Sequence, residues 1–109
     1  MAHFIVTGNY TQTAIKGMIA HPSDREAAAR GIIEECGGKV VLFLLTTGES
    51  DFLVVVEAPA AEGLLSSLLV IGASGAVSNL RTHLAFTSAE FTAAQKQSAA
   101  MMAAYRAPT

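Results

Sequence analysis

Two apolar segments joined by a short polar turn constrain the fold more than any other part of the sequence. Residues 40–46 and 52–57 are rich in Val, Leu and Phe, and a Gly-Glu-Ser turn at 48–50 lies between them. Apolar segments bounded by turn residues predict the two strands of an antiparallel hairpin. Both faces of each strand are largely apolar, which is typical of strands that are buried on both sides.

The segments around this hairpin predict the remaining secondary structure. Capping boxes at residues 23–26 and 87–90 indicate helix starts, and Gly37-Gly38 indicates a helix end. Pro59 is expected in the first turn of another helix. We expect strands at 3–9, 40–46, 52–57 and 77–86, a polar connector at 10–17, and helices from 23 to 36, from 59 to 72 and from 87 to about 105.

This order of elements predicts a single α+β domain that covers residues 1–109. The β-α-β-β-α-β core at residues 3–86 would form a ferredoxin-like antiparallel sheet with both helices on one face, followed by a C-terminal helix at 87–105. Because the other face of the sheet is left uncovered, its apolar side chains need a partner. We therefore expect two copies to pack face to face as a dimeric α/β barrel with an interior cavity.

The composition favours an oligomer. Charged residues make up 15% of the chain and hydrophobic residues 51%, whereas ordinary soluble domains have about 25% charged residues. A small monomer has too much surface for so few charges. We therefore expect a homodimer or a higher oligomer.

Charge and residue types also exclude several kinds of partner. The 7 Lys and Arg are scattered and the net charge is -2, so we do not expect nucleic-acid binding. The charge-free stretch at 63–80 contains Gly and Ser residues that favour a helix-turn-strand passage over a membrane span. The single Cys36 fits a reducing compartment, and the first residues lack the pattern of a signal peptide. These observations predict a cytoplasmic protein with no cofactor.

Six short segments carry a resemblance to a known family. They are Asn9-Tyr10-Thr11, Ala27-Ala28-Ala29-Arg30, Gly37-Gly38-Lys39, Thr47-Gly48-Glu49-Ser50-Asp51, Val56-Glu57-Ala58-Pro59 and Ala85-Phe86-Thr87. Through them the chain resembles the GYD-domain family of small bacterial proteins over nearly all of residues 3–95. Gly48 and Asp51 match the Gly-Tyr-Asp turn for which the family is named, whereas Ser50 stands in the place of its tyrosine. The resemblance implies a ferredoxin-like, dimeric α/β-barrel fold and little about activity.

Candidate site residues lie first at the mouth of the hairpin. Asp51 begins a strand directly after the turn, where its carboxylate could act as a general base or orient a substrate. The alternative is that Asp51 caps its own turn through backbone amides. Asn9 and Tyr10 end the first strand, and the Tyr10 hydroxyl could donate to an oxyanion or a bound carbonyl. The alternative for Tyr10 is that its ring only closes the end of the barrel.

A second group of candidates lies on the fourth strand. Asn79, Arg81 and His83 alternate with apolar residues and should face the barrel interior or the dimer interface. His83 could act as an acid or a base, and Arg81 could bind a carboxylate. Alternatively, Arg81 pairs with an acidic residue across the dimer and His83 is solvated. His3, on the neighbouring first strand, could approach either of them, but no histidine spacing supports a metal site.

These residues leave three functional hypotheses open. The first is a homo-oligomer that binds a small, mostly apolar organic molecule in a cavity between sheet and helices at the barrel interior, with Tyr10, Asp51, Arg81 and His83 as polar contacts. The second is a cofactor-free monooxygenase or isomerase with His83 or Asp51 as the base. The third is an assembly module whose barrel is packed solid.

Overall fold

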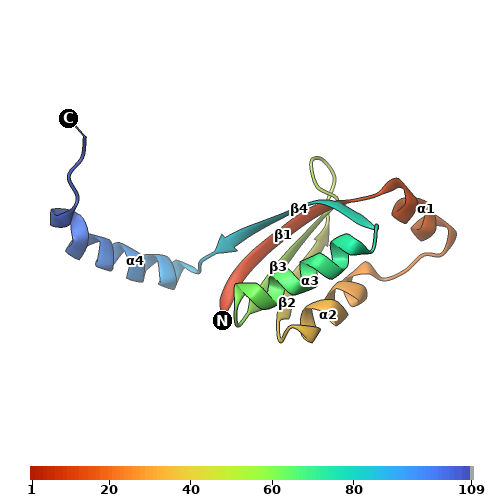
Figure 1. Ribbon diagram of the computed structural model, residues 1–109, viewed down its shortest axis with the longest axis horizontal. Coiled ribbons are helices and arrows are strands. Elements are labelled where there is room, and N and C mark those ends of the chain that lie inside the picture. The colour runs from red at the N-terminus through yellow and green to blue at the C-terminus, as the bar shows by residue number, and fades with distance from the viewer. Residues whose placement is uncertain (109) are drawn as a thin grey trace.

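The computed structural model describes residues 1–108 and contains one four-stranded antiparallel sheet (Figure 1). The strands are β1 (Ala2–Tyr10), β2 (Lys39–Leu45), β3 (Phe52–Ala58) and β4 (Val77–Ala85), in the order β2-β3-β1-β4. The helices are α1 (Gln12–Ala20), α2 (Arg25–Glu35), α3 (Ala61–Ala73) and α4 (Ser88–Met101), with a short 3-10 helix η1 at Met102–Ala104. This strand order and the antiparallel pairing confirm the predicted ferredoxin-like α+β fold.

Hydrogen bonds of side chains explain where the helices begin. The capping box predicted at Thr87 and Glu90 is present at the start of α4. At α2, however, the cap is Asp24, whose Oδ1 accepts from the Ala27 amide at 3.1 Å, while Ser23 Oγ accepts from the Arg25 guanidinium instead. Pro59 lies before α3 rather than in its first turn. The predicted starts were therefore wrong by one or two residues.

Helix α1 lies where the sequence predicted only a polar connector. The Thr11 hydroxyl caps this helix by accepting from the Ala14 amide at 3.2 Å, and it donates to the Gly75 carbonyl at 2.8 Å. The same side chain therefore starts α1 and fastens it to the turn between α3 and β4. This attachment places α1 beside one end of the sheet (Figure 1).

The hydrophobic core lies between the sheet and helices α2 and α3. Every second residue of β1 and β3 points toward these helices and is buried, because side chains alternate between the faces of a strand. Ile33 of α2 is 3% exposed and Leu64 of α3 is 2% exposed. The buried apolar residues are Phe4, Val6, Ile33, Val40, Phe52, Val54, Val56, Ala58 and Leu64.

Gly8 of β1 lies directly against Phe52 of β3. A Cβ atom at position 8 would lie 2.7 Å from Cζ of the Phe52 ring, which is closer than carbon atoms can approach. Glycine therefore lets the ring lie flat on the backbone of the neighbouring strand.

The other face of the sheet has no helix against it. Leu42 and Leu44 of β2 point to this open face and are 44% and 49% exposed, and Arg81 and His83 of β4 are exposed there as well. Within one chain, therefore, only the helix-covered face of the hairpin is buried, and its apolar side chains on the open face stay exposed. The sheet does not close on itself, so the barrel of the sequence prediction would need a second copy.

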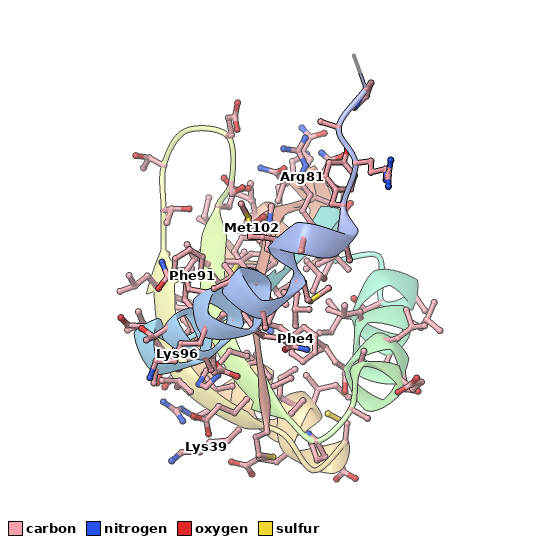
Figure 2. All side chains as sticks on the ribbon, turned by 90° about the vertical axis from the view of Figure 1, so that its left-hand side faces the viewer. Phe4, Lys39, Arg81, Phe91, Lys96 and Met102 are labelled. Atoms are coloured by element: carbon pink, nitrogen blue, oxygen red, sulfur yellow. The ribbon has the colours of Figure 1, made fainter. Side chains whose placement is uncertain are left out.

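Helix α4 extends away from the rest of the molecule as an arm (Figure 1). The radius of gyration is 17.7 Å and the longest dimension is 61 Å, whereas a compact chain of this length has a radius of about 13 Å. Every residue of α4 is exposed. Phe91 on this helix and Met102 on η1 are 61% and 75% exposed (Figure 2). The arm therefore presents apolar side chains that the body of the same chain does not cover.

Candidate functional site

A cavity of about 540 Å³ lies between the helix-covered face of the sheet and helices α1, α2 and α3. Its volume falls within the range of about 300–1,000 Å³ that is usual for small-molecule sites. The walls are mostly apolar and come from every layer of the domain. Val6 and Val54 form the floor on the sheet, and Ile32 and Leu68 form the walls on α2 and α3.

The polar side chains of the cavity gather at one end. Tyr10 is the last residue of β1, Arg25 is the first residue of α2, and His21 and Ser23 belong to the loop between α1 and α2. Tyr10 packs its ring against Phe52, with the ring centroids 5.4 Å apart. The same end of the cavity includes Ser74, from the turn that precedes β4.

The half-buried environment of Tyr10 favours the protonated form of its phenol. Burial raises the pKa of Tyr10 above its ordinary value, and the nearby positive charge of Arg25 opposes this shift in part. A protonated phenol is a hydrogen-bond donor at neutral pH. Tyr10 is thus the one sequence-predicted site residue that lines the cavity, and it can act there as the predicted donor.

Arg25 is a site residue that sequence reasoning missed. Its Nη1 donates to Ser23 Oγ at 2.9 Å, and within residues 1–108 no carboxylate oxygen lies within 4.0 Å of its guanidinium. One sequence signal could have identified it. An arginine in the first turn of a helix lies at the positive end of the helix dipole, where a cation is disfavoured.

Asp51 connects two strands rather than facing the cavity. Its Oδ2 accepts from the backbone amide of Tyr10 at 2.9 Å and from Asn9 Nδ2 at 3.4 Å. Its own backbone amide donates to the Gly8 carbonyl at 2.8 Å. Asp51 therefore fixes the end of β1 against the start of β3, a role different from the predicted cap of its own turn.

Asn9 and Asn79 extend this network across the sheet. Asn9 Nδ2 donates to the Glu49 carbonyl at 2.9 Å, and Asn79 Nδ2 donates to Asn9 Oδ1 at 3.3 Å. Asn79 has a φ of 53° at an irregularity in the pairing of β1 with β4. The regular alternation of β4 is interrupted between Arg81 and Asn79, and the Asn79 side chain is bonded to Asn9. The turn, β1 and β4 are joined through these amides.

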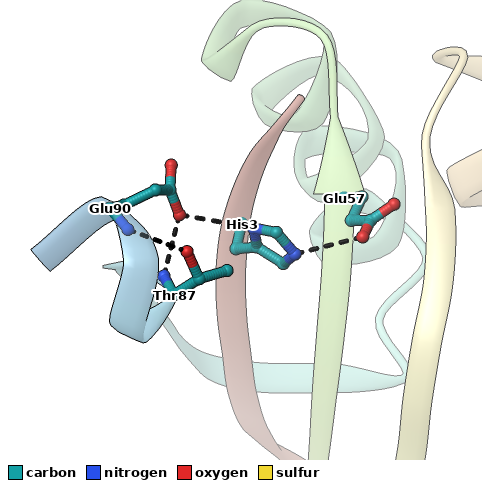
Figure 3. Close-up of polar contacts among 4 residues, drawn as sticks. All are labelled: His3, Glu57, Thr87 and Glu90. Carbon is teal, nitrogen blue, oxygen red and sulfur yellow. Dashed lines mark hydrogen bonds and ion pairs between the residues drawn. The ribbon is translucent and has the colours of Figure 1, made fainter. Parts of the chain in front are cut away.

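His3 belongs to a separate polar cluster on the open face (Figure 3). Its Nε2 lies 3.1 Å from Glu57 Oε1, and its Nδ1 lies 4.0 Å from Glu90 Oε1. The predicted approach of His3 to His83 or Arg81 is replaced by these two contacts, because His3 faces Glu57 on one neighbouring strand and Ala85 on the other. The cluster links the first turn of α4 to the sheet.

Arg81 and His83 lie on the open face and do not line the cavity. Both are exposed, and no ion pair involves either of them within residues 1–108. In this part of the chain, no group of three or more His, Cys, Asp or Glu residues is arranged to hold a metal ion. None of the helices described is long and apolar enough to cross a membrane.

The fold is similar to that of solved structures, and the sequence matches a known family. The family model of the GYD domain matches residues 4–94, whereas no curated protein matches the sequence. The chain is similar to TTHA0845 from Thermus thermophilus, with 20% identity and a TM-score of 0.54 over 81% of this chain and 96% of that one. It is also similar to MtbAldR, with 19% identity and a TM-score of 0.54 over 80% of this chain, and it spans 52% of that protein. At these identities the likeness concerns the fold alone.

Proposed function

The chain belongs to the GYD domain family, and from that premise we propose that it is a homo-oligomeric protein that binds a small, mostly apolar organic molecule. The ligand occupies the cavity between the sheet and helices α1, α2 and α3. Tyr10 is a polar contact in this cavity. Asp51 and Asn9 do not contact the cavity, but they help to position Tyr10, since they hold the backbone at the end of β1.

The cavity itself is the observation that carries this proposal. The cavity is open to solvent on one side, and its lining is mostly apolar. Residues of the lining such as Val70, which is 57% exposed, leave apolar surface in contact with water. An apolar ligand would cover this surface, which is favourable in proportion to the apolar area removed from water.

The cavity lies on the helix-covered face of the sheet and not in the barrel interior that the sequence predicted, because a barrel interior would form between two open faces. A barrel packed solid would leave this cavity in place, so only the binding test below separates a ligand-binding protein from an assembly module.

A matched pair of leucines on α3 tests ligand binding. Leu68 lines the cavity, whereas Leu69 is 66% exposed and does not. The neutral dye N-phenylnaphthylamine, whose fluorescence rises in apolar surroundings, should bind the unmodified protein. Leu68→Trp should fill the cavity and weaken this binding at least tenfold, and Leu69→Trp should leave it unchanged. Equal binding by the two variants would contradict the proposal.

The open face and the arm support the homo-oligomer. Leu42 and Leu44 on the face, and Phe91, Met101 and Met102 on the arm, are large apolar side chains exposed within one chain. Monomers rarely expose apolar patches of this kind. A second copy packed on the open face would complete the predicted barrel, with Met101 and Met102 of each arm against the neighbouring subunit.

Light scattering tests the assembly. The unmodified protein should have at least twice the mass of one chain at micromolar concentration. Leu44→Glu places a charge on the open face and should produce monomers, whereas Leu65→Glu, at a 56% exposed position on α3, should not. A monomeric unmodified protein would contradict the proposed assembly.

The enzyme hypothesis has less structural support. His83 and Asp51, the two proposed bases, lie outside the cavity, and Asp51 already accepts two hydrogen bonds. A general base must reach the proton that it removes, either directly or through one water. We therefore place the binding function first.

A further inference from the structure

The cavity is polar at one end and apolar along the rest of its length. The floor on β3 runs from Phe52 to Val56, a distance of about 13 Å at roughly 3.3 Å per residue. Tyr10 and Arg25 lie at the Phe52 end, next to the exposed loop residues His21 and Ser23. The far end is lined by buried side chains of the core, among them Ile33 and Val56. A ligand that fits this gradient is polar at one end and apolar in its body.

The charge at the polar end is positive, and within residues 1–108 Arg25 forms no ion pair. The two acidic side chains that flank Arg25 in the sequence already have partners. Asp24 accepts from the Ala27 amide, and Glu26 binds Arg30 at 2.7 Å. Arg25 itself donates to the neutral hydroxyl of Ser23, which leaves most of its five N–H donors free of protein partners within residues 1–108.

We propose that the ligand is an apolar carboxylic acid, with its carboxylate bound by Arg25 and the Tyr10 hydroxyl and its apolar body lying along Val6 and Val54. The planar fork of a guanidinium matches the two oxygens of a carboxylate. This inference rests on the proposed function, since it names the chemical class of the molecule in the same cavity.

The half-buried phenol supports the choice of an anion. A tyrosine hydroxyl is protonated over the physiological range, and burial, which raises the pKa of Tyr10, favours this donor form further. Two donors, Arg25 and Tyr10, then lie at the polar end, and no Asp or Glu side chain of residues 1–108 lines the cavity. An amine or a neutral sugar would find no acidic acceptor there. A carboxylate can accept hydrogen bonds from both Arg25 and Tyr10.

Competition against N-phenylnaphthylamine tests the headgroup. Decanoate and decanol have the same chain length and differ in the charged group. Decanoate should displace the dye at a concentration about tenfold lower than decanol. Arg25→Gln should remove this difference, and Arg25→Lys should keep part of it because the charge remains. Arg81→Gln, which removes an arginine from the open face, is the matched control and should behave as the unmodified protein.

The outcomes separate this inference from the function on which it rests. If decanoate and decanol displace the dye equally well, the cavity binds apolar molecules but the proposed headgroup is wrong. If Arg25→Gln keeps the full preference for decanoate while its circular dichroism is unchanged, the assignment of Arg25 is overturned. If the dye does not bind at all, the proposed function fails and this inference fails with it.

Discussion

The two faces of the same sheet differ in almost every property. The helix-covered face carries buried Val, Phe and Leu side chains and a cavity, with Tyr10 and Arg25 among the polar residues at one end of it. The open face carries exposed leucines and the cluster of His3, Glu57 and Glu90. Adjacent residues of one strand therefore serve different surfaces, because side chains alternate between the faces. The proposed ligand site and the proposed assembly surface can thus change independently on the same four strands.

The largest expected effect is on the helix-covered face. Leu64→Ala removes a side chain that is 2% exposed on α3 and should lower the free energy of unfolding by roughly 2–5 kcal/mol. Leu65→Ala changes a neighbouring residue that is 56% exposed and should cost less than about 0.5 kcal/mol. Urea unfolding followed by circular dichroism measures both. A similar loss of unfolding free energy in the two variants would show that Leu64, which faces the sheet, contributes no more than the exposed Leu65.

The next effect concerns the bond between the ends of β1 and β3. Asp51→Ala leaves the Tyr10 amide without its acceptor and should cost about 1–3 kcal/mol, as expected for a hydrogen bond to a charged group. Asp51→Asn keeps an acceptor oxygen and should cost less. Urea unfolding measures the stability, and N-phenylnaphthylamine titration measures the cavity. A stable Asp51→Ala variant would show that this network does not hold the two strands together.

A smaller and more local effect is expected in the arm. Thr87→Ala removes the cap of α4 and should cost about 1 kcal/mol of helix stability. Because the body does not pack against α4, the loss should appear as reduced helicity at residues 88–101 rather than as a change in the unfolding midpoint. Thr92→Ala, which changes an exposed threonine within the same helix, is the control. Backbone chemical shifts distinguish the two variants.

The smallest effect is the pH dependence of the same helix start. The Thr87 backbone amide donates to the Glu90 carboxylate at 2.8 Å and lowers the pKa of Glu90 below its ordinary value of 4.5, with smaller contributions from the Thr87 hydroxyl and from His3. A lowered folded-state pKa means that the stabilisation is present above pH 4.5 and is lost as the pH falls through the folded value. NMR titration of residues 87–91 should show the first turn fraying below that pH. Glu90→Gln should remove the dependence.

The sequence predicted the fold well because the fold depends on local patterns. The apolar hairpin, the strand order and the box at Thr87 follow from alternation, turn residues and capping side chains. Helix α1 was missed because its start depends on Thr11, whose hydroxyl caps the helix and also binds the Gly75 carbonyl. The local sequence does not predict a contact with a residue so far along the chain.

The site was predicted only in part because it depends on pairing and packing. Tyr10 was expected at a strand end and lines the cavity there. The partner of Asp51 follows from the register of β1 with β3, which the sequence does not specify. Arg25 reaches the cavity because α2 packs on the covered face of the sheet with its first residue at the Tyr10 end. Its position in the first turn of a helix marks it as unusual, but the sequence does not say that this turn lies beside Tyr10.

The contact between Gly8 and Phe52 has a consequence for the range of molecules that the cavity can accept. Phe52 lines the cavity at its polar end, and the missing side chain at position 8 is what allows the ring to lie back against β1. A methyl group there would push the ring forward into the space that a ligand would use. Residue 8 is not among the residues lining the cavity, yet its lack of a side chain allows the position of the Phe52 ring at the polar end, where the proposed headgroup binds.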